Sequence, residues 1–437
     1  MKTPIADFVN EYINSETERL HMPGHKGVGN IEKFDITEIK GADYLHASSG
    51  IIKESEDNAA RLFGSEITLY STEGSSTVIK AMCYLSILIT GKKRILAMRN
   101  AHKSFLDASA LLDFDVDWIA NKSFDNLCSS DIDYSDLEEK LKNNDYACIY
   151  ITSPDYLGNM LDLNKIAQIA KKYNIITIAD NAHGAYLRFL NSKLHPLECG
   201  ISMCADSAHK TLPCFTGGAY LHLNKNLDEN IYDNAKKAIS IFSSTSPSYL
   251  ILESLDLCNR FLENVEEKLK TTVNKVEILK IKLKKLNYTV VLSDPLKLTI
   301  KASDYGYTGF EMADILRKNR IEVEYSDPDY IVLMITEYNG ERIFDVLENE
   351  FSRIKKKEAL IGPTFNYTFP NRAMSIREAC MHLSKEIFVD DANGKVMGYG
   401  NIICPPAISI VTPGEVIDEN TIQILKYYGY EKVNVLI

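Results

Sequence analysis

Short apolar segments alternate with stretches of helical periodicity over residues 41–250, and this alternation constrains the fold more than any other feature. The strand candidates are 94–98, 146–152 and 175–179, and the helix candidates are 78–88 and 163–173. Short buried strands separated by helices are typical of a mostly parallel sheet with helices on both faces. In such sheets, ligands bind beyond the carboxyl ends of the strands.

Four residues that could contact a ligand follow directly on predicted strands: Gly74, Asn100, Ser153 and Asp180. Because the carboxyl ends of parallel strands meet at one edge, we expect these residues to share that edge. Glu73-Gly74-Ser75-Ser76-Thr77 lies at a strand-to-helix turn, where the helix N-terminus and the hydroxyls offer hydrogen bonds to a phosphate. A plain serine N-cap is the alternative interpretation. The turn matches neither GxGxxG nor a Walker sequence, so it does not indicate a nucleotide site.

An acid and a lysine complete this pattern. Asp180 ends the strand candidate at 175–179, and Lys210 lies in Ser207-Ala208-His209-Lys210-Thr211-Leu212. A pyridoxal phosphate site needs an acid that keeps the pyridine nitrogen protonated and a lysine that forms an imine with the cofactor aldehyde. Each residue alone is unspecific, since strands often end in Asp and most lysines are solvated. Together with the glycine-containing turn, they predict pyridoxal 5'-phosphate as the cofactor.

Several neighbouring residues suit the same cofactor. His102 follows another strand end and is placed to stack on the pyridine ring, although a lone histidine is often just a hydrogen-bonded surface residue. The continuation Ala182-His183-Gly184 suits a residue that lies beneath or beside the cofactor. Ser207 and His209 flank the lysine and could donate hydrogen bonds to the phosphate.

The sequence does not indicate a metal site or a disulfide framework. His21 and His25 are separated by Pro23-Gly24, which prevents them from sharing a simple helix face. The nine cysteines are an odd number and include no CxxC pair. They are expected to be small buried hydrophobes in a reducing compartment.

The charge and hydropathy of the chain exclude several kinds of partner. A formal net charge of −11 argues against nucleic acid or an anionic membrane surface. No stretch approaches the roughly 18 uninterrupted apolar residues of a membrane span, and the N-terminus has no apolar core of a signal peptide. We therefore expect a cytoplasmic protein.

The chain is expected to divide into four parts. Residues 249–286 form a long helical tract that we interpret as a domain-connecting helix rather than a coiled coil. A smaller α/β unit follows, with strands at 296–302, 321–325 and 330–335 and helices at 309–319 and 340–357. The predicted parts are an N-terminal segment (1–40), a large cofactor domain (41–250), the connecting helix with the small domain (251–360) and a C-terminal domain (361–437).

Six motifs, in order along the chain, resemble the Orn/Lys/Arg decarboxylase family. They are His-Met-Pro-Gly-His-Lys-Gly at 21–27, Asn-Ala-His-Lys-Ser at 100–104, Asp-Asn-Ala-His-Gly-Ala at 180–185, Ser-Ala-His-Lys-Thr-Leu at 207–212, Thr-Ser-Pro-Ser-Tyr at 245–249 and Thr-Pro-Gly-Glu at 412–415. The resemblance implies an α/β, aspartate-aminotransferase-like fold (pyridoxal phosphate fold type I), with a large, mostly parallel sheet domain, a smaller α/β domain and a C-terminal decarboxylase segment. No receiver-like wing domain precedes the first motif, so the chain resembles the short form of the family.

The resemblance also implies roles for individual residues. Lys210 would be the Schiff-base lysine, Asp180 the partner of the pyridinium nitrogen, and His102 the residue on the ring face. The remaining cofactor-binding residues would be Gly74, Ser75, Ser76, His183, Ser207 and His209. Because enzymes of this fold build each active site at a dimer interface, a homodimer or a multiple of it is implied.

The implied reaction is decarboxylation of arginine, lysine or ornithine to the amine and CO2, with a connection to polyamine biosynthesis. A buried distal cation of such a substrate needs an acid, for which Glu322, Glu324 and Glu415 are the candidates. An aminotransferase or lyase that acts on a modified amino acid is the alternative on the same scaffold. An inactive cofactor-binding regulator is a second alternative, against which the presence of Lys210, Asp180 and His102 argues.

The chain departs from the family pattern at three places, and the third of them bears on the substrate. Glu73 precedes Gly74 where the family usually has Asn, and Asn181 replaces the usual acid after the pyridinium-pairing Asp. The family run Tyr-Pro-Pro-Gly-Ile-Pro reads Cys-Pro-Pro-Ala-Ile-Ser at 404–409. That run helps to shape the substrate end of the site in the family.

Overall fold

The computed structural model describes residues 1–121, 131–142, 145–291, 294–363, 367–400 and 409–437. These residues group into two compact units, each assembled from several segments of the chain. The first unit comprises Met1–Ala97, Glu138–Ser153 and Asp162–Glu267, and the second comprises Met98–Leu137, Pro154–Leu161 and Lys268–Ile437. Because the segments of the two units alternate along the chain, their boundaries differ from the predicted divisions at 40, 250 and 360, and the domain division stays a prediction.

Six strands of the first unit form a continuous, mostly parallel sheet. In spatial order they are β1 (Ile67–Ser71), β7 (Ala219–Leu223), β6 (Met203–Asp206), β5 (Ile176–Asp180), β4 (Cys148–Thr152) and β2 (Arg94–Ala97). Only β7 runs antiparallel to its neighbours; the pairs β6–β5, β5–β4 and β4–β2 are parallel. All residues of β6 and β7 are buried, as expected for strands in a sheet covered on both faces. The predicted fold class is confirmed.

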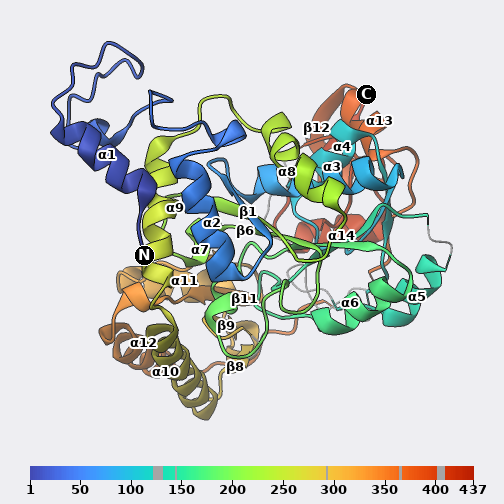
Figure 1. Cartoon of the computed structure of the whole chain (residues 1–437). Coiled ribbons are helices and arrows are strands. Elements are labelled where there is room, and N and C mark those ends of the chain that lie inside the picture. Colours follow the sequence, from blue (N-terminus) through green and yellow to red (C-terminus); the bar gives the residue numbers. More distant parts are fainter. Residues whose placement is uncertain (122–130, 143–144, 292–293, 364–366, 401–408) are drawn as a thin grey trace. The chain divides into compact units, whose positions relative to one another are not determined.

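The helices of the first unit bury the apolar residues that the sequence pattern identified. They are α1 (Pro4–Asn14), α2 (Ile51–Phe63), α3 (Ser75–Thr90), α6 (Leu163–Lys172), α7 (Ala208–Thr211), α8 (Glu229–Ile241) and α9 (Tyr249–Leu262). Helix α3 packs against β5, β6, β7 and α8, while α2 and α9 lie side by side (Figure 1). The apolar face of α3 is therefore in the centre of this unit, and its N-terminus is held at the edge of the sheet.

The second unit contains the smaller sheet and the C-terminal segment. Its sheet has the order β10 (Tyr325–Ser326), β11 (Tyr330–Met334), β9 (Lys297–Lys301) and β8 (Thr289–Val291), and all pairs are antiparallel. The associated helices are α11 (Gly309–Lys318) and α12 (Arg342–Arg353). In the C-terminal segment, β12 (Ser384–Phe388) pairs with β13 (Lys432–Leu436), and α13 (Ile376–Met381) packs on α4 (Lys103–Leu112).

Two predicted elements of this region were wrong in detail. The helical tract at 249–286 is two helices, α9 and α10 (Glu266–Lys285), and not one. Between them the backbone N–H groups of Asn264 and Val265 bond three residues back, to Phe261 and Leu262, which ends the α-helical pattern. The strand predicted at 321–325 is reduced to the two residues of β10.

None of the helices in the described part of the chain is long and apolar enough to span a membrane.

Candidate active site

The carboxyl ends of four parallel strands bring predicted site residues to one edge of the first unit's sheet. Asp180 is the last residue of β5, Ser153 follows β4, Ser207 follows β6, and Gly74 lies shortly after β1. The backbone N–H of Ser153 donates to the carbonyl of Asp180 at 3.1 Å, which places these two strand ends side by side. The predicted shared edge is therefore confirmed for Gly74, Ser153 and Asp180, whereas Asn100 belongs to the second unit.

Asp180 is a buried carboxylate with hydrogen-bond donors but no cationic partner. Its Oδ2 accepts from the Tyr150 hydroxyl at 3.0 Å, and its Oδ1 accepts from the Ala182 N–H at 3.2 Å. Burial raises the pKa of Tyr150 well above its usual value, and the charge of Asp180 adds to this shift, so the tyrosine stays a donor. No lysine, arginine or histidine of the described residues pairs with Asp180. An ionised carboxylate in such a place is costly until a cation meets it, and a protonated pyridine nitrogen fits this need.

Lys210 lies on the short helix α7, close to His183. The lysine Nζ is 3.2 Å from His183 Nε2, and this imidazole is 8% exposed. His209, the preceding residue, has its Nδ1 2.9 Å from the carbonyl of Gly218. Burial lowers the pKa of His209; the bond to Gly218 opposes this shift and the charge of Lys210 adds to it. Lys210, His183 and His209 are thus held in one unit.

The N-terminus of α3 forms the phosphate-binding part of the site. Ser207 Oγ donates to Ser75 Oγ at 2.8 Å, so the residues predicted to hold the phosphate from two motifs are in contact. Gly74, the N-cap, has φ +75°, and a Cβ at this position would meet nothing within 4 Å. Half-buried Ser76 is the second residue of the helix, and the first turn carries no acidic side chain. Free N–H groups, hydroxyls and open space at a helix N-terminus fit a phosphate.

The carboxylate of Glu73 is engaged with a neighbouring loop. Its Oε1 accepts from the backbone N–H of Ser244 at 2.6 Å, in the connection between α8 and α9. This hydrogen bond gives the unusual acid a partner of its own beside the predicted phosphate site.

His102 lies in the second unit and caps helix α4. Its Nδ1 accepts from the backbone N–H of Ser104 at 3.2 Å and lies 2.9 Å from the hydroxyl of the same residue. The ring is therefore held in a defined orientation at the helix N-terminus. Its stacking on the cofactor stays a prediction.

Comparison with known proteins identifies the scaffold. The family model of the major domain of Orn/Lys/Arg decarboxylases matches residues 3–293, more than half of the chain. The chain belongs to the Orn/Lys/Arg decarboxylase family. Arginine decarboxylase of Bacillus subtilis is 28% identical over 460 residues, which cover 97% of this chain and 93% of that protein. The uncharacterized protein YaaO of the same organism is 28% identical over 458 residues, with 97% and 94% covered.

Solved structures of lysine decarboxylases share the fold. The Francisella novicida lysine decarboxylase LdcF has a TM-score of 0.81 at 18% identity, covering 100% of this chain and 81% of that chain. The constitutive lysine decarboxylase of E. coli has a TM-score of 0.81 at 17% identity, covering 100% and 82%. Because the chain belongs to the Orn/Lys/Arg decarboxylase family, the protein is a pyridoxal-phosphate-dependent decarboxylase, and the cofactor prediction is confirmed.

The three glutamates predicted to meet the substrate have different surroundings in this decarboxylase. Glu322 is exposed and accepts from Arg317 Nε at 2.7 Å, and exposed Glu324 accepts from the Tyr156 hydroxyl at 2.9 Å. Glu415 is 4% exposed, and both of its oxygens accept from the guanidinium of Arg99. Each carboxylate already has a protein donor, and their role toward substrate stays a prediction. The run at 404–409 lies outside the described residues except for Ser409.

Sequence reasoning missed a fully buried polar group beside the cofactor residues. His195, Asp206 and His222 each offer one possible metal-ligand atom, a ring nitrogen or a carboxylate oxygen, and these three atoms lie within 4.8 Å of one another. Imidazole and carboxylate are groups that bind zinc, but the 3.0 Å between His195 Nε2 and Asp206 Oδ2 is an ordinary hydrogen-bond distance. We interpret the group as a hydrogen-bonded network. The sequence did offer one indication of this group, because Asp206 directly precedes Ser207 and Asn181 directly follows Asp180.

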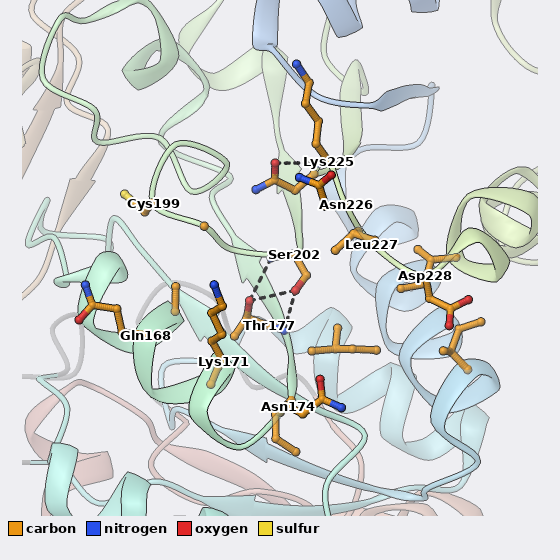
Figure 2. A pocket seen from close by; sticks show the side chains of 18 of the residues that line it. Gln168, Lys171, Asn174, Thr177, Cys199, Ser202, Lys225, Asn226, Leu227 and Asp228 are labelled. Atoms are coloured by element: carbon orange, nitrogen blue, oxygen red, sulfur yellow. Dashed lines mark hydrogen bonds between the residues drawn. The ribbon is translucent and has the colours of Figure 1, made fainter.

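A pocket of the first unit lies away from these residues. It has a volume of about 630 Å³ and is lined by Gln168, Lys171, Asn174, Lys225 and Asp228, among others (Figure 2). It also includes Ile176, the first residue of β5, and Asn224, which follows β7. The pocket therefore lies at the amino edge of the parallel strands, opposite the edge that holds Asp180, and it does not mark the active site.

Proposed function

We propose that this protein decarboxylates arginine to the corresponding amine and CO2, with lysine and ornithine as the weaker candidates. The observation that supports the site is the buried Asp180 carboxylate, which has no cationic partner among the described residues and lies at the same sheet edge as Lys210 and the N-terminus of α3. The choice of arginine is supported by the similarity to the arginine decarboxylase of Bacillus subtilis, which covers 97% of this chain. A homodimer with active sites at its interface and a cytoplasmic location belong to the same proposal.

Each residue has one task in this proposal. Lys210 holds the cofactor covalently, and Ser75, Ser76, Ser207 and His209 hold its phosphate at the N-terminus of α3. Asp180, oriented by Tyr150 and by the N–H of Ala182, keeps the proton on the ring nitrogen. By the family resemblance, His183 and His102 would be the residues that contact the ring of the bound cofactor.

The bound cofactor supplies the electron sink that stabilises negative charge at the substrate Cα. The carboxylate leaves as CO2, and the electron pair of the broken bond is then protonated at Cα. Lys210 Nζ, the group that would hold the cofactor, is the candidate proton donor to Cα, and His183 Nε2 lies 3.2 Å from it, close enough to exchange a proton with it. Burial around Asp180 and Ser207, which are 3% and 1% exposed, keeps water from this part of the site.

The test is the visible absorbance of the cofactor-loaded protein, followed by arginine, lysine and ornithine with detection of CO2 and amine. We expect arginine to change the absorbance and to release CO2 and amine in equal amounts. Lys210→Ala should abolish both the visible band and turnover, whereas Lys225→Ala, at an exposed lysine of the same unit, should change neither. Turnover by Lys210→Ala, or conversion of the cofactor to its amine form without CO2, would refute the proposal.

A further inference from the structure

Asp206 is a buried carboxylate that three other side chains approach. It ends β6 and directly precedes Ser207, and its side chain is completely buried. Its Oδ1 accepts from Asn181 Nδ2 at 2.7 Å, and its Oδ2 lies 3.0 Å from His195 Nε2 and 3.3 Å from His222 Nε2. All four residues are 0% exposed. No step of the proposed reaction uses any of them.

The bond between Asn181 and Asp206 joins the two strand ends that carry the cofactor residues. Asn181 follows Asp180 at the end of β5, and its backbone N–H donates to the carbonyl of Ala205 at 2.9 Å. A backbone bond and a side-chain bond therefore cross from β5 to β6 at the level of the site. On one side lies Asp180, the partner of the ring nitrogen, and on the other lie Ser207 and Lys210.

His222 connects Asp206 to β7 and β1, the strands that follow β6 in the sheet on the side away from β5. His222 belongs to β7, and its Nδ1 is 2.7 Å from the hydroxyl of Thr68 in β1. The rings of Phe63 and His222 are 4.3 Å apart and nearly parallel, with an angle of 32° between their planes. Asp206 thus bonds to Asn181 beyond β5 and lies 3.3 Å from His222 of β7, whose ring is hydrogen-bonded to Thr68 of β1, so a shift of these strands would disturb buried polar contacts.

The side chains around Asp206 favour its ionised form. Burial opposes ionisation of Asp206, but the charge and hydrogen bonds of His195 and His222 outweigh it and lower the pKa of this carboxyl. Burial lowers the pKa of His222, although its bond to Asp206 opposes the shift. The carboxamide of Asn181 completes the group as a neutral donor. The acid that the family usually carries after its pyridinium-pairing Asp would place a second carboxylate against Asp206.

We propose that Asp206 is a positioning residue of the cofactor site, which through Asn181 sets the distance between Asp180 and the Ser207–Lys210 segment. The inference rests on the roles given to Asp180 and Lys210 in the proposed function. It adds a residue that touches neither cofactor nor substrate and acts through its two neighbours. Its effect should appear in cofactor affinity and in the protonation of the loaded cofactor, and not only in stability.

The experiment compares the full-length wild-type protein with Asp206→Asn and Asn181→Ala. Asp256→Asn is the matched control, because Asp256 is also buried in the first unit and accepts from the backbone N–H groups of Ile5 and Ala6 at 2.9 and 3.0 Å. The measurements are the dissociation constant of pyridoxal phosphate, the pH midpoint of the visible band of the loaded protein, and the thermal unfolding midpoint without cofactor.

We expect Asp206→Asn and Asn181→Ala to weaken cofactor binding at least about tenfold, or about 1.4 kcal/mol, and to move the pH midpoint of the visible band. Asp256→Asn should lower the unfolding midpoint and leave both cofactor readouts at their wild-type values. Asn181→Ala removes the link to Asp206 but leaves the contact of Asp206 with His195 in place. The inference can therefore still be tested with this variant if Asp206→Asn fails to fold.

Folded variants at 181 and 206 with wild-type cofactor affinity and an unchanged pH midpoint would overturn the inference. Failure of the proposed function looks different. In that case wild type itself forms no visible band, or Lys210→Ala retains it, whatever the variants at 181 and 206 do.

Discussion

Arg99 and Glu415 form a buried ion pair with two parallel hydrogen bonds, although they are far apart in the sequence. Arg99 Nη1 donates to Glu415 Oε1 at 2.7 Å, and Nη2 donates to Oε2 at 2.6 Å. Arg99 Nε also donates to the carbonyl of Ser409 at 2.9 Å, and the Trp118 ring centroid is 4.8 Å from the guanidinium carbon. The pair therefore fastens the Pro-Gly-Glu motif to the loop that carries His102, three residues after Arg99.

Loss of the Glu415 carboxylate should mainly lower the stability of the protein, and any change in substrate binding should follow from that loss. Burial disfavours the charge of Arg99, but Glu415 outweighs this effect and raises the pKa of the guanidinium. Glu415→Ala leaves that cation buried and unpaired, for which we expect a loss of about 3–5 kcal/mol in the free energy of unfolding. Denaturant titration measures this loss. Glu341→Ala removes an exposed ion pair with Lys275 and should have no measurable effect. An unchanged stability of Glu415→Ala with a raised KM would instead support the predicted role of Glu415 toward the substrate.

Gly74→Ala should weaken cofactor binding more than its effect on stability explains. The φ of +75° at this N-cap disfavours any side chain, and the new methyl group would enter the open space in front of α3. We expect at least about tenfold weaker binding of pyridoxal phosphate, or about 1.4 kcal/mol. Gly91→Ala is the control at the other end of α3, because Gly91 has φ +67° and a Cβ there also meets nothing within 4 Å. Both variants should unfold at lower temperature, but only Gly74→Ala should lose affinity; equal affinities would contradict the predicted phosphate site.

Glu253 should make the protein less stable as the pH rises toward 8. Burial raises the pKa of this carboxyl to about 8, and the charges of Asp256 and Asp35 add to the shift. The folded state therefore keeps a proton that the unfolded state releases above its own pKa of 4.5, so stability falls between these two values by at most about 1.4 kcal/mol per pH unit.

Glu253→Gln should remove this slope. The variant should match wild type near pH 4.5 and become progressively more stable than wild type up to pH 8, as measured by denaturant titration at several pH values. Glu54→Gln, at an exposed position of α2, should leave the slope as it is. A wild-type slope in Glu253→Gln would mean that Glu253 is ionised in the folded protein throughout this range.

The cofactor residues could be predicted from the sequence because their signals are local. Asp180 and Ser207 each end or follow an apolar run, and the rule for parallel strands brings such ends to one edge without knowledge of the packing. Ser75 and Gly74 lie at a strand-to-helix turn that can be read from a few residues. Lys210 follows from its motif, and its distance to His183 only refines the placement.

The partners of these residues could not be predicted, because they depend on contacts between distant segments. Nothing near Glu415 in the sequence indicates that Arg99, and not a substrate cation, meets its carboxylate. In the same way, His195 pairs with Asp206 only because the fold brings the two together, with the His195 ring beside Phe63 and the Asp206 carboxylate beside His222. The interruption between α9 and α10 was missed for a different reason, since the helical composition continues across it and tertiary packing decides where the chain turns.

The hydrogen bond between Asn181 and Asp206 can be tested by exchanging the carboxamide and the carboxylate between the two positions. Asn181→Asp alone places two carboxylates where a 2.7 Å amide-to-carboxylate hydrogen bond now lies, and both positions are completely buried. We expect it to lose cofactor affinity and stability more severely than Asn181→Ala, because like charges in a buried site repel each other.

The double variant Asn181→Asp/Asp206→Asn restores one carboxylate and one carboxamide with the opposite order. It should recover part of both losses, since the amide can donate to the new carboxylate and its oxygen can still accept from His195. Unfolding free energies and cofactor dissociation constants of the two single variants and the double variant form a thermodynamic cycle, for which we expect a favourable coupling of about 1–3 kcal/mol. Additive losses would show that the two side chains act independently, and that the link between the ends of β5 and β6 is not what holds the cofactor residues in place.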